Sequence, residues 1–352
     1  MKPDMVAEFK RALFIGLGGA GQRHLRILKE LQPDIQIAAV RKRGRTFEIR
    51  DDMRPDKSVN LEDKYEIQRF KKISDSMGFR PDFAIVANPT SLHVETVIEL
   101  VENRIPVLVE KPISNSDDGL DKLLLLSKGN KTPVMVGYMM RFNPCVKLLK
   151  RYLDKIALGR IYNIIVNINS YMPAWHGYES YNEFYAGRKD LGGGVVLTEI
   201  HEIDLLYWFF GKHSKLTAIG GNISNFKIDV EDTVSIIMEQ NDTANCFPVS
   251  VNMSFVQKTP VRNFLILGEF GRLEWDIINN RLQFDDYEHD LHETHQFPEF
   301  DRKDMFRDQM NHFLDCLKKG TSPLTELGKV LGGQYIAFAV KEALEKQPFT
   351  TL

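Results

Sequence analysis

The sequence predicts an α/β protein of two domains, residues 1–140 and 141–352. In the first domain, short apolar runs alternate with longer helical stretches, which is the pattern of parallel strands joined by crossover helices. In the second domain, strand-like runs follow one another with short turns and no helices between them, which indicates antiparallel pairing. We therefore expect a doubly wound parallel sheet, followed by an α/β domain built on a large, mostly antiparallel sheet.

The predicted strands of the first domain are continuous apolar runs, as expected when helices cover both faces of a sheet. Between them, apolar residues recur at helical spacing around Leu25, Val97 and Leu123. The stretch from Arg41 to Asp63 is charged and contains Gly44 and Pro55, so we expect a long polar loop there. The predicted strands are Leu13–Ile15, Ile35–Val40, Phe83–Val86, Val107–Val109 and Val134–Val136.

The second domain is predicted to begin with a helix over Val146–Lys155 and to end with two more, Lys303–Lys318 and Glu326–Glu345. Strand-like runs fill the sequence between these helices, with glycines in the turns. The predicted strands are Ile161–Ile168, Leu216–Ile223, Val230–Met238, Phe247–Phe255, Arg262–Leu267, Arg272–Trp275 and Arg281–Phe284.

Composition excludes several classes of protein. The 46 Lys and Arg residues are balanced by 48 Asp and Glu, so no overall positive field exists to hold nucleic acid or anionic lipid. No run approaches the about 20 apolar residues that a bilayer span requires, and Met1–Arg11 is too polar for a signal peptide. We expect a cytoplasmic protein that binds neither nucleic acid nor a membrane.

A G-x-G-x-x-G motif lies between the first predicted strand and the first predicted helix. Gly16 would make the tight turn, Gly18 would let the backbone approach a pyrophosphate, and Gly21 would let the helix pack on the strand. The N–H groups and positive dipole end of that helix would face the phosphates. The motif therefore predicts a dinucleotide site, in which Gly19 and Ala20 also take part.

The second predicted strand ends at Val40, where an NAD-preferring site usually offers a carboxylate to the ribose. This chain has Arg41-Lys42-Arg43-Gly44-Arg45 instead. A guanidinium can bind a 2′-phosphate with two hydrogen bonds, whereas a carboxylate would repel it. We expect NADP as the preferred cofactor and keep NAD as the alternative, because basic runs are also common on solvated loops.

Glu110-Lys111-Pro112 follows a buried strand at its carboxyl end, the edge at which open α/β sheets bind ligands. Pro112 keeps Lys111 out of the helical region, so a stiff turn presents the ammonium group. A lysine beside an oxidised nicotinamide would exchange its proton more readily than a solvated one. The position therefore predicts a catalytic lysine.

Together, these features resemble the glucose-fructose oxidoreductase, inositol dehydrogenase and rhizopine catabolism protein family, abbreviated Gfo/Idh/MocA. The resemblance implies an N-terminal Rossmann domain, a C-terminal domain with an open antiparallel sheet that makes dimers or tetramers, and nicotinamide-dependent oxidation or reduction of a sugar-like carbinol. It rests on the glycine motif, Ala87-Asn88-Pro89-Thr90 with His93, Glu110-Lys111-Pro112, Gly137-Tyr138 with Arg141-Phe142-Asn143-Pro144, and Gly192-Gly193-Gly194 ahead of His201-Glu202-Ile203-Asp204.

The resemblance also implies roles for individual residues. Lys111 would hydrogen-bond the reacting hydroxyl, and His201 would give or take its proton. Tyr138 and Thr198 would lie at the substrate. The implied cofactor-binding residues are Gly16, Gly18, Gly19, Ala20, Gly21, Arg41, Asn88, Pro89, His93, Glu110, Lys111 and Arg141.

One position departs from the family pattern. Relatives commonly carry an aspartate three or four residues before the histidine, where this chain has Thr198 and Leu197. A carboxylate there would orient the imidazole, and a threonine hydroxyl can do only the orienting. Glu199 is a substitute only if it points towards His201. The chemistry could persist on Lys111 and His201, be slower, or have been lost.

An aromatic segment, Ser170–Tyr185, precedes the triple glycine and is loop-like. Its flat amphipathic side chains suit a pyranose or a base, and Arg188 could bind a carboxylate or phosphate. The alternative is an aromatic core under a long loop. We expect substrate contacts from Tyr171, Trp175, His176 and Arg188.

The remaining histidines suggest no metal. His289, His292 and His295 recur at a three-residue step that does not align on one strand face, and hydride transfer requires no metal. His24 and His312 lie in helical runs and are interpreted as packed or surface residues.

The sequence thus predicts an NAD(P)-dependent oxidoreductase acting on a CH–OH group of a sugar, polyol or nucleotide-activated sugar, and a homo-oligomer. A second hypothesis is a non-catalytic dinucleotide-binding sensor or scaffold, supported by the missing aspartate near Thr198. A third retains the cofactor but uses transient oxidation to cleave a glycosidic bond.

Overall fold

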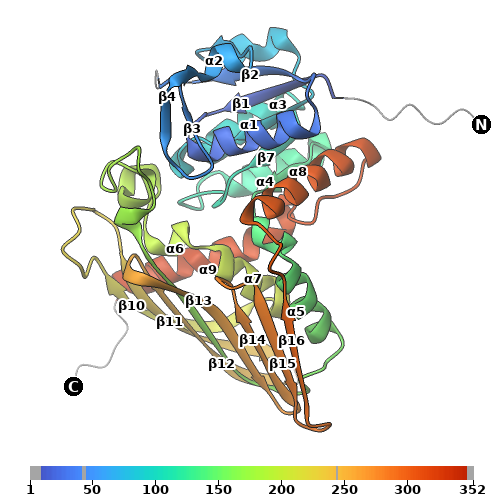
Figure 1. Ribbon diagram of the computed structural model, residues 1–352, viewed down its shortest axis with the longest axis vertical. Coiled ribbons are helices and arrows are strands. Elements are labelled where there is room, and N and C mark those ends of the chain that lie inside the picture. The colour runs from blue at the N-terminus through green and yellow to red at the C-terminus, as the bar shows by residue number, and fades with distance from the viewer. Residues whose placement is uncertain (1–8, 42–44, 243–244, 347–352) are drawn as a thin grey trace, which may run out of the picture. The chain divides into compact units, whose positions relative to one another are not determined.

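The computed structural model describes residues 9–41, 45–242 and 245–346, and the chain forms two compact units (Figure 1). The first unit contains residues 1–137, 176–180 and 306–329, and the second contains 138–175, 181–305 and 330–352. The principal change of unit therefore falls between Gly137 and Tyr138. Two later segments of the chain also belong to the first unit.

The first unit is built on a six-stranded parallel sheet in the order β5-β2-β1-β6-β7-β8. Its strands are short and apolar, and β1, β6, β7 and β8 are buried almost throughout, as the sequence predicts. The elements in chain order are β1 (Arg11–Ile15), α1 (Gly19–Leu31), β2 (Gln36–Val40), β3 (Phe47–Ile49), β4 (Pro55–Asn60), α2 (Leu61–Lys64), β5 (Gln68–Phe70), β6 (Phe83–Val86), α3 (His93–Glu102), β7 (Val107–Val109), α4 (Leu120–Asn130) and β8 (Val134–Val136).

This strand order reverses direction between β1 and β6, and such a switch point is where doubly wound sheets bind ligands. The segment 306–329, which includes most of α8 (Arg302–Lys319), completes the unit beside β8. Thr325 exchanges hydrogen bonds with Val136, through its hydroxyl at 2.6 Å and its carbonyl at 2.9 Å. Phe313 packs edge to face on Phe83, with ring centroids 5.6 Å apart.

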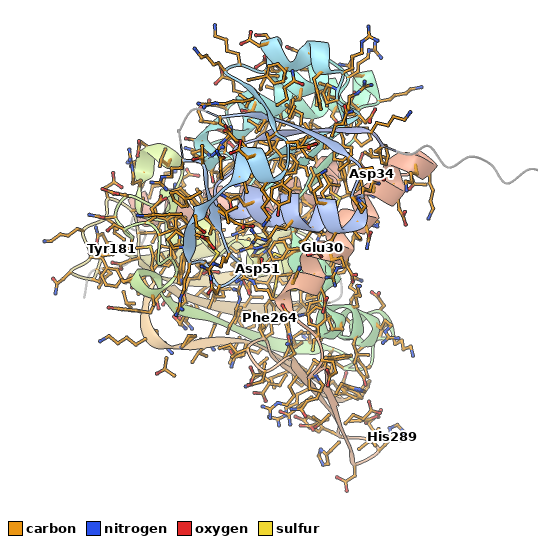
Figure 2. All side chains as sticks on the ribbon, turned by 45° about the horizontal axis from the view of Figure 1, so that its top comes forward. Glu30, Asp34, Asp51, Tyr181, Phe264 and His289 are labelled. Atoms are coloured by element: carbon orange, nitrogen blue, oxygen red, sulfur yellow. The ribbon has the colours of Figure 1, made fainter. Side chains whose placement is uncertain are left out.

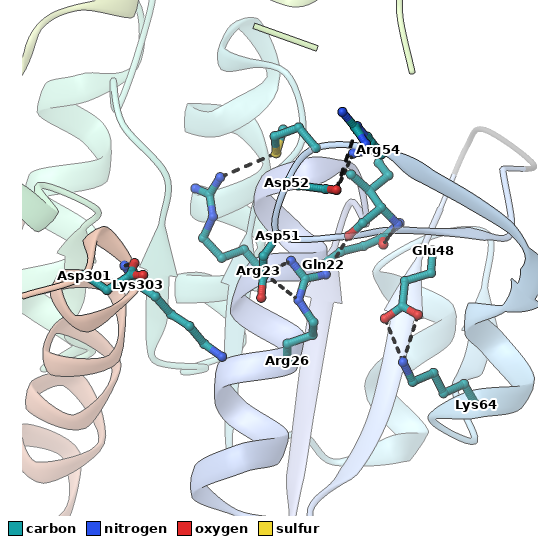
Figure 3. A network of polar contacts seen from close by, with 12 residues as sticks. Gln22, Arg23, Arg26, Glu48, Asp51, Asp52, Arg54, Lys64, Asp301 and Lys303 are labelled. Atoms are coloured by element: carbon teal, nitrogen blue, oxygen red, sulfur yellow. Dashed lines mark hydrogen bonds and ion pairs between the residues drawn. The ribbon is translucent and has the colours of Figure 1, made fainter. Parts of the chain in front are cut away.

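The prediction of a long polar loop over 41–63 is wrong in part, because the segment contains two strands and the start of a helix. β3 and β4 pair as an antiparallel hairpin, and α2 follows directly. The hairpin is fixed to α1 by Gln22, whose Oε1 accepts the Ile49 N–H at 2.6 Å, and by the ion pair of Arg26 with Asp51 (Figure 3). These contacts with α1 fix the position of the hairpin.

The second unit is built on an eight-stranded sheet in the order β10-β11-β12-β9-β13-β14-β15-β16. All neighbours pair antiparallel except β12 and β9, which are parallel. Its elements are α5 (Pro144–Asp154), β9 (Ile161–Tyr171), α6 (Val195–Thr198), α7 (His201–Phe210), β10 (His213–Gly221), β11 (Thr233–Asp242), β12 (Asn245–Ser254), β13 (Val256–Gly268), β14 (Gly271–Asp276), β15 (Arg281–Asp286), β16 (Leu291–Gln296) and α9 (Leu327–Lys346).

One face of this sheet carries the core of the second unit. Alternate residues along β9 and its neighbours, such as Val166, Val251 and Phe264, are completely buried. α5 contacts β14 and β15, and α6 contacts β11 and β12. Ile219 and Ile237 are 60% and 50% exposed, and the registers of β10 with β11 place them on one face. No helix in the described part of the chain is long and apolar enough to cross a membrane.

The edge strand β16 was not expected from the sequence. It pairs with β15 in a hairpin, and His289 lies at the turn (Figure 2). His289 and His292 contact Asp286 and Asp285 at 2.8 and 2.9 Å, which raises the pKa of both imidazoles. Among the described residues, no three histidine, cysteine or carboxylate side chains are grouped so that they could hold a metal ion.

Candidate active site

The glycine motif forms the turn between β1 and α1. Gly16 has φ of +92°, and a Cβ there would lie 2.7 Å from the Ala87 carbonyl oxygen after β6. A Cβ on Gly21 would lie 2.3 Å from the Gly16 oxygen, so only glycine lets α1 pack this closely on the turn. A Cβ on Gly18 would meet nothing within 4 Å. The first and third glycines are thus required by packing, and the second faces open space.

The loop after β6 is held in place by two polar contacts. Asn88 donates from Nδ2 to the hydroxyl of Thr96 at 2.9 Å. The buried His93 contacts the carbonyl oxygens of Asn88 at 2.9 Å and Pro112 at 2.8 Å, and it therefore bridges the loops that follow β6 and β7. Burial lowers the pKa of His93 despite these contacts. Within the described part of the chain, the Oδ1 of Asn88 is buried and has no hydrogen-bond partner.

Glu110 is paired with His24, a residue that the sequence suggested only as packing. The His24 Nε2 lies 2.7 Å from the Glu110 Oε1, and the His24 side chain is 1% exposed. Burial favours the neutral form of Glu110, but the hydrogen bond and charge of His24 and the charges of Lys111 and Arg23 outweigh it and lower the pKa of Glu110 to about 2. The turn thus holds a fixed negative charge directly before Lys111.

The described basic residues after β2 are engaged with carboxylates. The guanidinium of Arg41 is buried and contacts Glu62 at 2.6 Å and the Arg45 carbonyl. Burial lowers the pKa of Arg41, and Glu62 opposes that effect. Arg45 pairs with Glu179. Lys42, Arg43 and Gly44 of the predicted phosphate-binding run lie outside the described residues.

In the second unit, His201 begins α7 and is 3% exposed. Its ring meets the ring of Tyr138 edge to face, with centroids 6.0 Å apart. Tyr138 is completely buried, burial raises the pKa of its phenol, and its hydroxyl has no hydrogen-bond partner among the described residues. Thr198 ends the preceding helix α6 and is also buried. The structure therefore brings Tyr138, Thr198 and His201 into one part of the second unit.

Glu199 contacts an arginine in the second unit. Arg262 donates to both oxygens of the buried Glu202 at 2.6 and 2.9 Å, and its Nη1 lies 3.3 Å from Glu199. Burial raises the pKa of Glu202 although Arg262 opposes the shift. Glu199, the possible substitute for the missing aspartate, therefore forms an ion pair with Arg262.

Arg141 forms a bidentate pair with Asp204, with nitrogen to oxygen distances of 2.9 and 2.6 Å. Both side chains are 1% exposed, and the guanidinium lies 4.9 Å from the Trp208 ring centroid. Burial raises the pKa of Asp204 against the influence of Arg141. The residue predicted to bind cofactor thus stabilises the interior of the second unit.

The aromatic segment is divided between the two units. Tyr171 and Trp175 belong to the second unit, where Trp175 packs edge to face on Phe255 with centroids 5.1 Å apart. His176 belongs to the first unit. Arg188 is 39% exposed and forms a bidentate pair with Asp190. The four predicted substrate residues therefore do not form one cluster within either unit.

Family models match most of the chain. Residues 10–138 match the model of the oxidoreductase family with an NAD-binding Rossmann fold, and residues 146–274 match the GFO/IDH/MocA C-terminal domain. Two curated relatives are the 2,7-anhydro-N-acetylneuraminate hydratase of Mediterraneibacter gnavus, 25% identical over 60% of this chain and 52% of its own, and the scyllo-inositol 2-dehydrogenase (NAD(+)) of Bacillus subtilis, 27% identical over 60% and 56%. The chain spans about half, or less, of the length of the first curated relatives.

The fold is also found among solved structures. The WlbA dehydrogenase from Bordetella pertussis, solved in complex with NADH and UDP-GlcNAcA, has a TM-score of 0.77 at 18% identity and covers 98% of this chain and 100% of its own. At this identity the likeness concerns the fold. It extends over both units, since nearly the whole chain is covered.

Proposed function

Because the chain belongs to the GFO/IDH/MocA oxidoreductase family, whose N-terminal domain is an NAD-binding Rossmann fold, we propose that it transfers hydride between NAD(P) and a CH–OH carbon. The substrate class is a sugar, a polyol or a nucleotide-activated sugar. A relative named for scyllo-inositol, and a similar fold solved with UDP-GlcNAcA, support that class.

The observation that carries the proposal is the turn from Gly16 to Gly21. Gly18 leaves open space beside the N-terminus of α1, and no side chain of its own caps that helix. Phosphate oxygens would accept hydrogen bonds from the N–H groups of the first turn of α1. The buried Oδ1 of Asn88 can accept from an amide or ribose hydroxyl of the same dinucleotide. The residues present therefore fit a nicotinamide dinucleotide.

Lys111 and His201 divide the proton chemistry in this proposal. The nicotinamide, when bound, supplies the acceptor or donor of the hydride. Lys111 hydrogen-bonds the reacting oxygen and stabilises its negative charge, while His201 removes or returns the hydroxyl proton. Tyr138 and Thr198 contribute polar atoms that orient the carbinol. Glu110 places a negative charge directly before Lys111.

Lys111→Ala tests the assignment. We expect kcat to fall by about two orders of magnitude or more on a panel of sugars and polyols, because a positioned acid–base group is lost. The dissociation constant for NAD(P)H, measured by fluorescence titration, should change little. Lys122→Ala, which removes an exposed lysine paired with Glu102, is the control. Unchanged turnover in Lys111→Ala rejects the role of Lys111, and dinucleotide binding without any hydride transfer in the wild type supports a sensor.

We propose further that Arg41 favours NADP over NAD and that Glu62 limits the preference. A 2′-phosphate would gain the guanidinium but face the carboxylate 2.6 Å from it. Glu62→Gln should therefore raise the ratio of NADP to NAD affinity, and Arg41→Asp should reverse it. Titration of both dinucleotides into each variant measures the ratio. A wild type that prefers NAD, with no response to Glu62→Gln, contradicts this proposal.

Self-association through the exposed face of the eight-stranded sheet is the proposal for quaternary structure. Ile219 and Ile237 are exposed apolar side chains on that face, and a second copy of the chain would cover them. Light scattering coupled to size-exclusion chromatography gives the mass directly. A monomer at micromolar concentration contradicts it.

A further inference from the structure

Five residues in the middle of the chain, His176–Ser180, leave the second unit and lie with the first. We call this segment the strap. It follows Trp175, which packs in the second unit, and precedes Tyr181, which belongs to that unit again. The proposed function does not use the strap, and the sequence analysis expected only a substrate contact from His176.

The strap lies on the glycine turn. The hydroxyl oxygen of Tyr178 lies beside Gly19, because a Cβ on Gly19 would be 2.9 Å from that oxygen. His176 stacks on the Tyr178 ring, with centroids 5.0 Å apart and planes 17° apart. Glu179 pairs with Arg45, the last residue of the predicted phosphate-binding run. Tyr178 and Glu179 of the strap thus contact two segments of the proposed dinucleotide site, the glycine turn and the end of the basic run.

The position of Tyr178 beside Gly19 indicates which group of the dinucleotide it would contact. Gly19 is the first residue of α1, and its N–H is among those that a pyrophosphate receives in this motif. Burial and the charge of Glu179 raise the pKa of Tyr178 to about 12, so the phenol keeps its proton at neutral pH. Because the hydroxyl lies beside the first residue of α1, its O–H can be donated to an anion held there.

We propose that Tyr178 is a cofactor-binding residue, which donates its hydroxyl hydrogen to the pyrophosphate and holds the strap over it. This inference rests on the proposed dinucleotide site. It adds to the site a binding residue that is distant from the glycine motif in sequence. The Glu179–Arg45 pair fixes the strap at its other end, so that release of the dinucleotide requires the strap to lift.

Tyr178→Phe tests the inference, because it removes the hydroxyl and keeps the ring that stacks on His176. We expect the dissociation constants for NADH or NADPH to rise about tenfold or more, as for the loss of a hydrogen bond to a charged group. ADP-ribose, which has the pyrophosphate but no nicotinamide, should lose the same factor. Release measured by stopped-flow displacement should be faster in Tyr178→Phe and in Glu179→Gln.

Tyr181→Phe is the matched control, since that hydroxyl accepts from the Lys227 N–H at 3.4 Å in the second unit. Its dinucleotide affinity should stay within twofold of the wild type. Equal affinities of wild type and Tyr178→Phe overturn the inference, and tighter binding by the variant overturns it too, because the hydroxyl would then compete with phosphate for Gly19. A wild type that binds neither dinucleotide rejects the proposed function itself. Thermal unfolding curves confirm that each variant is folded.

Discussion

At the scale of single residues, the charge before the proposed catalytic lysine depends on a pair of side chains distant in sequence. The pKa of Glu110 is lowered to about 2 because its contacts with His24 and the charges of Lys111 and Arg23 outweigh the effect of burial. A difference of this size from the usual value of 4.5 corresponds to a contribution on the order of 3 kcal/mol to the folding free energy above pH 5.

That contribution gives a pH prediction with a definite sign. The pKa of Glu110 is lowered in the folded protein, so its stabilisation is present above pH 4.5 and is lost as the pH falls towards 2. Glu110→Gln should therefore be less stable than the wild type at pH 7, and the difference should shrink on acidification. Urea unfolding at several pH values from 7 to 3 measures it. Glu95→Gln, an exposed change on α3, should show no such trend.

The sequence could identify those site residues that lie in contiguous motifs, and it missed pairs of residues that are distant in sequence. The glycine motif and the turn at Lys111 are contiguous, so they could be read directly. His24 occupies a buried position on the helical stripe of Leu25 and Leu28, and nothing in the sequence showed that Glu110 lies opposite. Arg141 was expected at the cofactor because of its motif, but its buried partner Asp204 is 63 residues away.

At the scale of elements, different glycines of the turn between β1 and α1 serve packing and the proposed binding of a dinucleotide. Gly21→Ala would force a Cβ against the Gly16 oxygen and should lower the unfolding temperature. Gly18→Ala adds a methyl group to open space, so the unfolding temperature should stay near that of the wild type while dinucleotide affinity falls. Differential scanning fluorimetry and fluorescence titration provide the two readouts. Equal dinucleotide affinity in Gly18→Ala and the wild type contradicts a pyrophosphate at this turn.

The same scale explains which elements the sequence could predict. Strands β1, β6, β7 and β8 are buried on both faces, and their apolar runs show it. The β3–β4 hairpin is polar and short, and it depends on contacts with α1 that lie outside its own sequence (Figure 3). β16 carries His292 and Glu293 and lies at the edge of its sheet, so it lacks the buried alternation that marks its neighbours.

At the scale of the whole molecule, the boundary expected at residue 140 lies close to the first change of unit at Gly137. A single boundary does not describe the chain, however, since it returns to the first unit at 176–180 and again at 306–329. Local periodicity reports where elements begin and end. It carries no information on which sheet a later segment joins, and that is why the strap could not be predicted.

The hydrogen bonds between Thr325 and Val136 of β8 tie a late segment of the chain to the sheet of the first unit. Cutting after residue 140 removes the segment that pairs with Val136 and the ring of Phe313 that covers Phe83. The excised fragment would expose the edge of β8 and an apolar surface, and we expect it to aggregate. A single cut cannot isolate this unit, because it is assembled from three stretches of one chain.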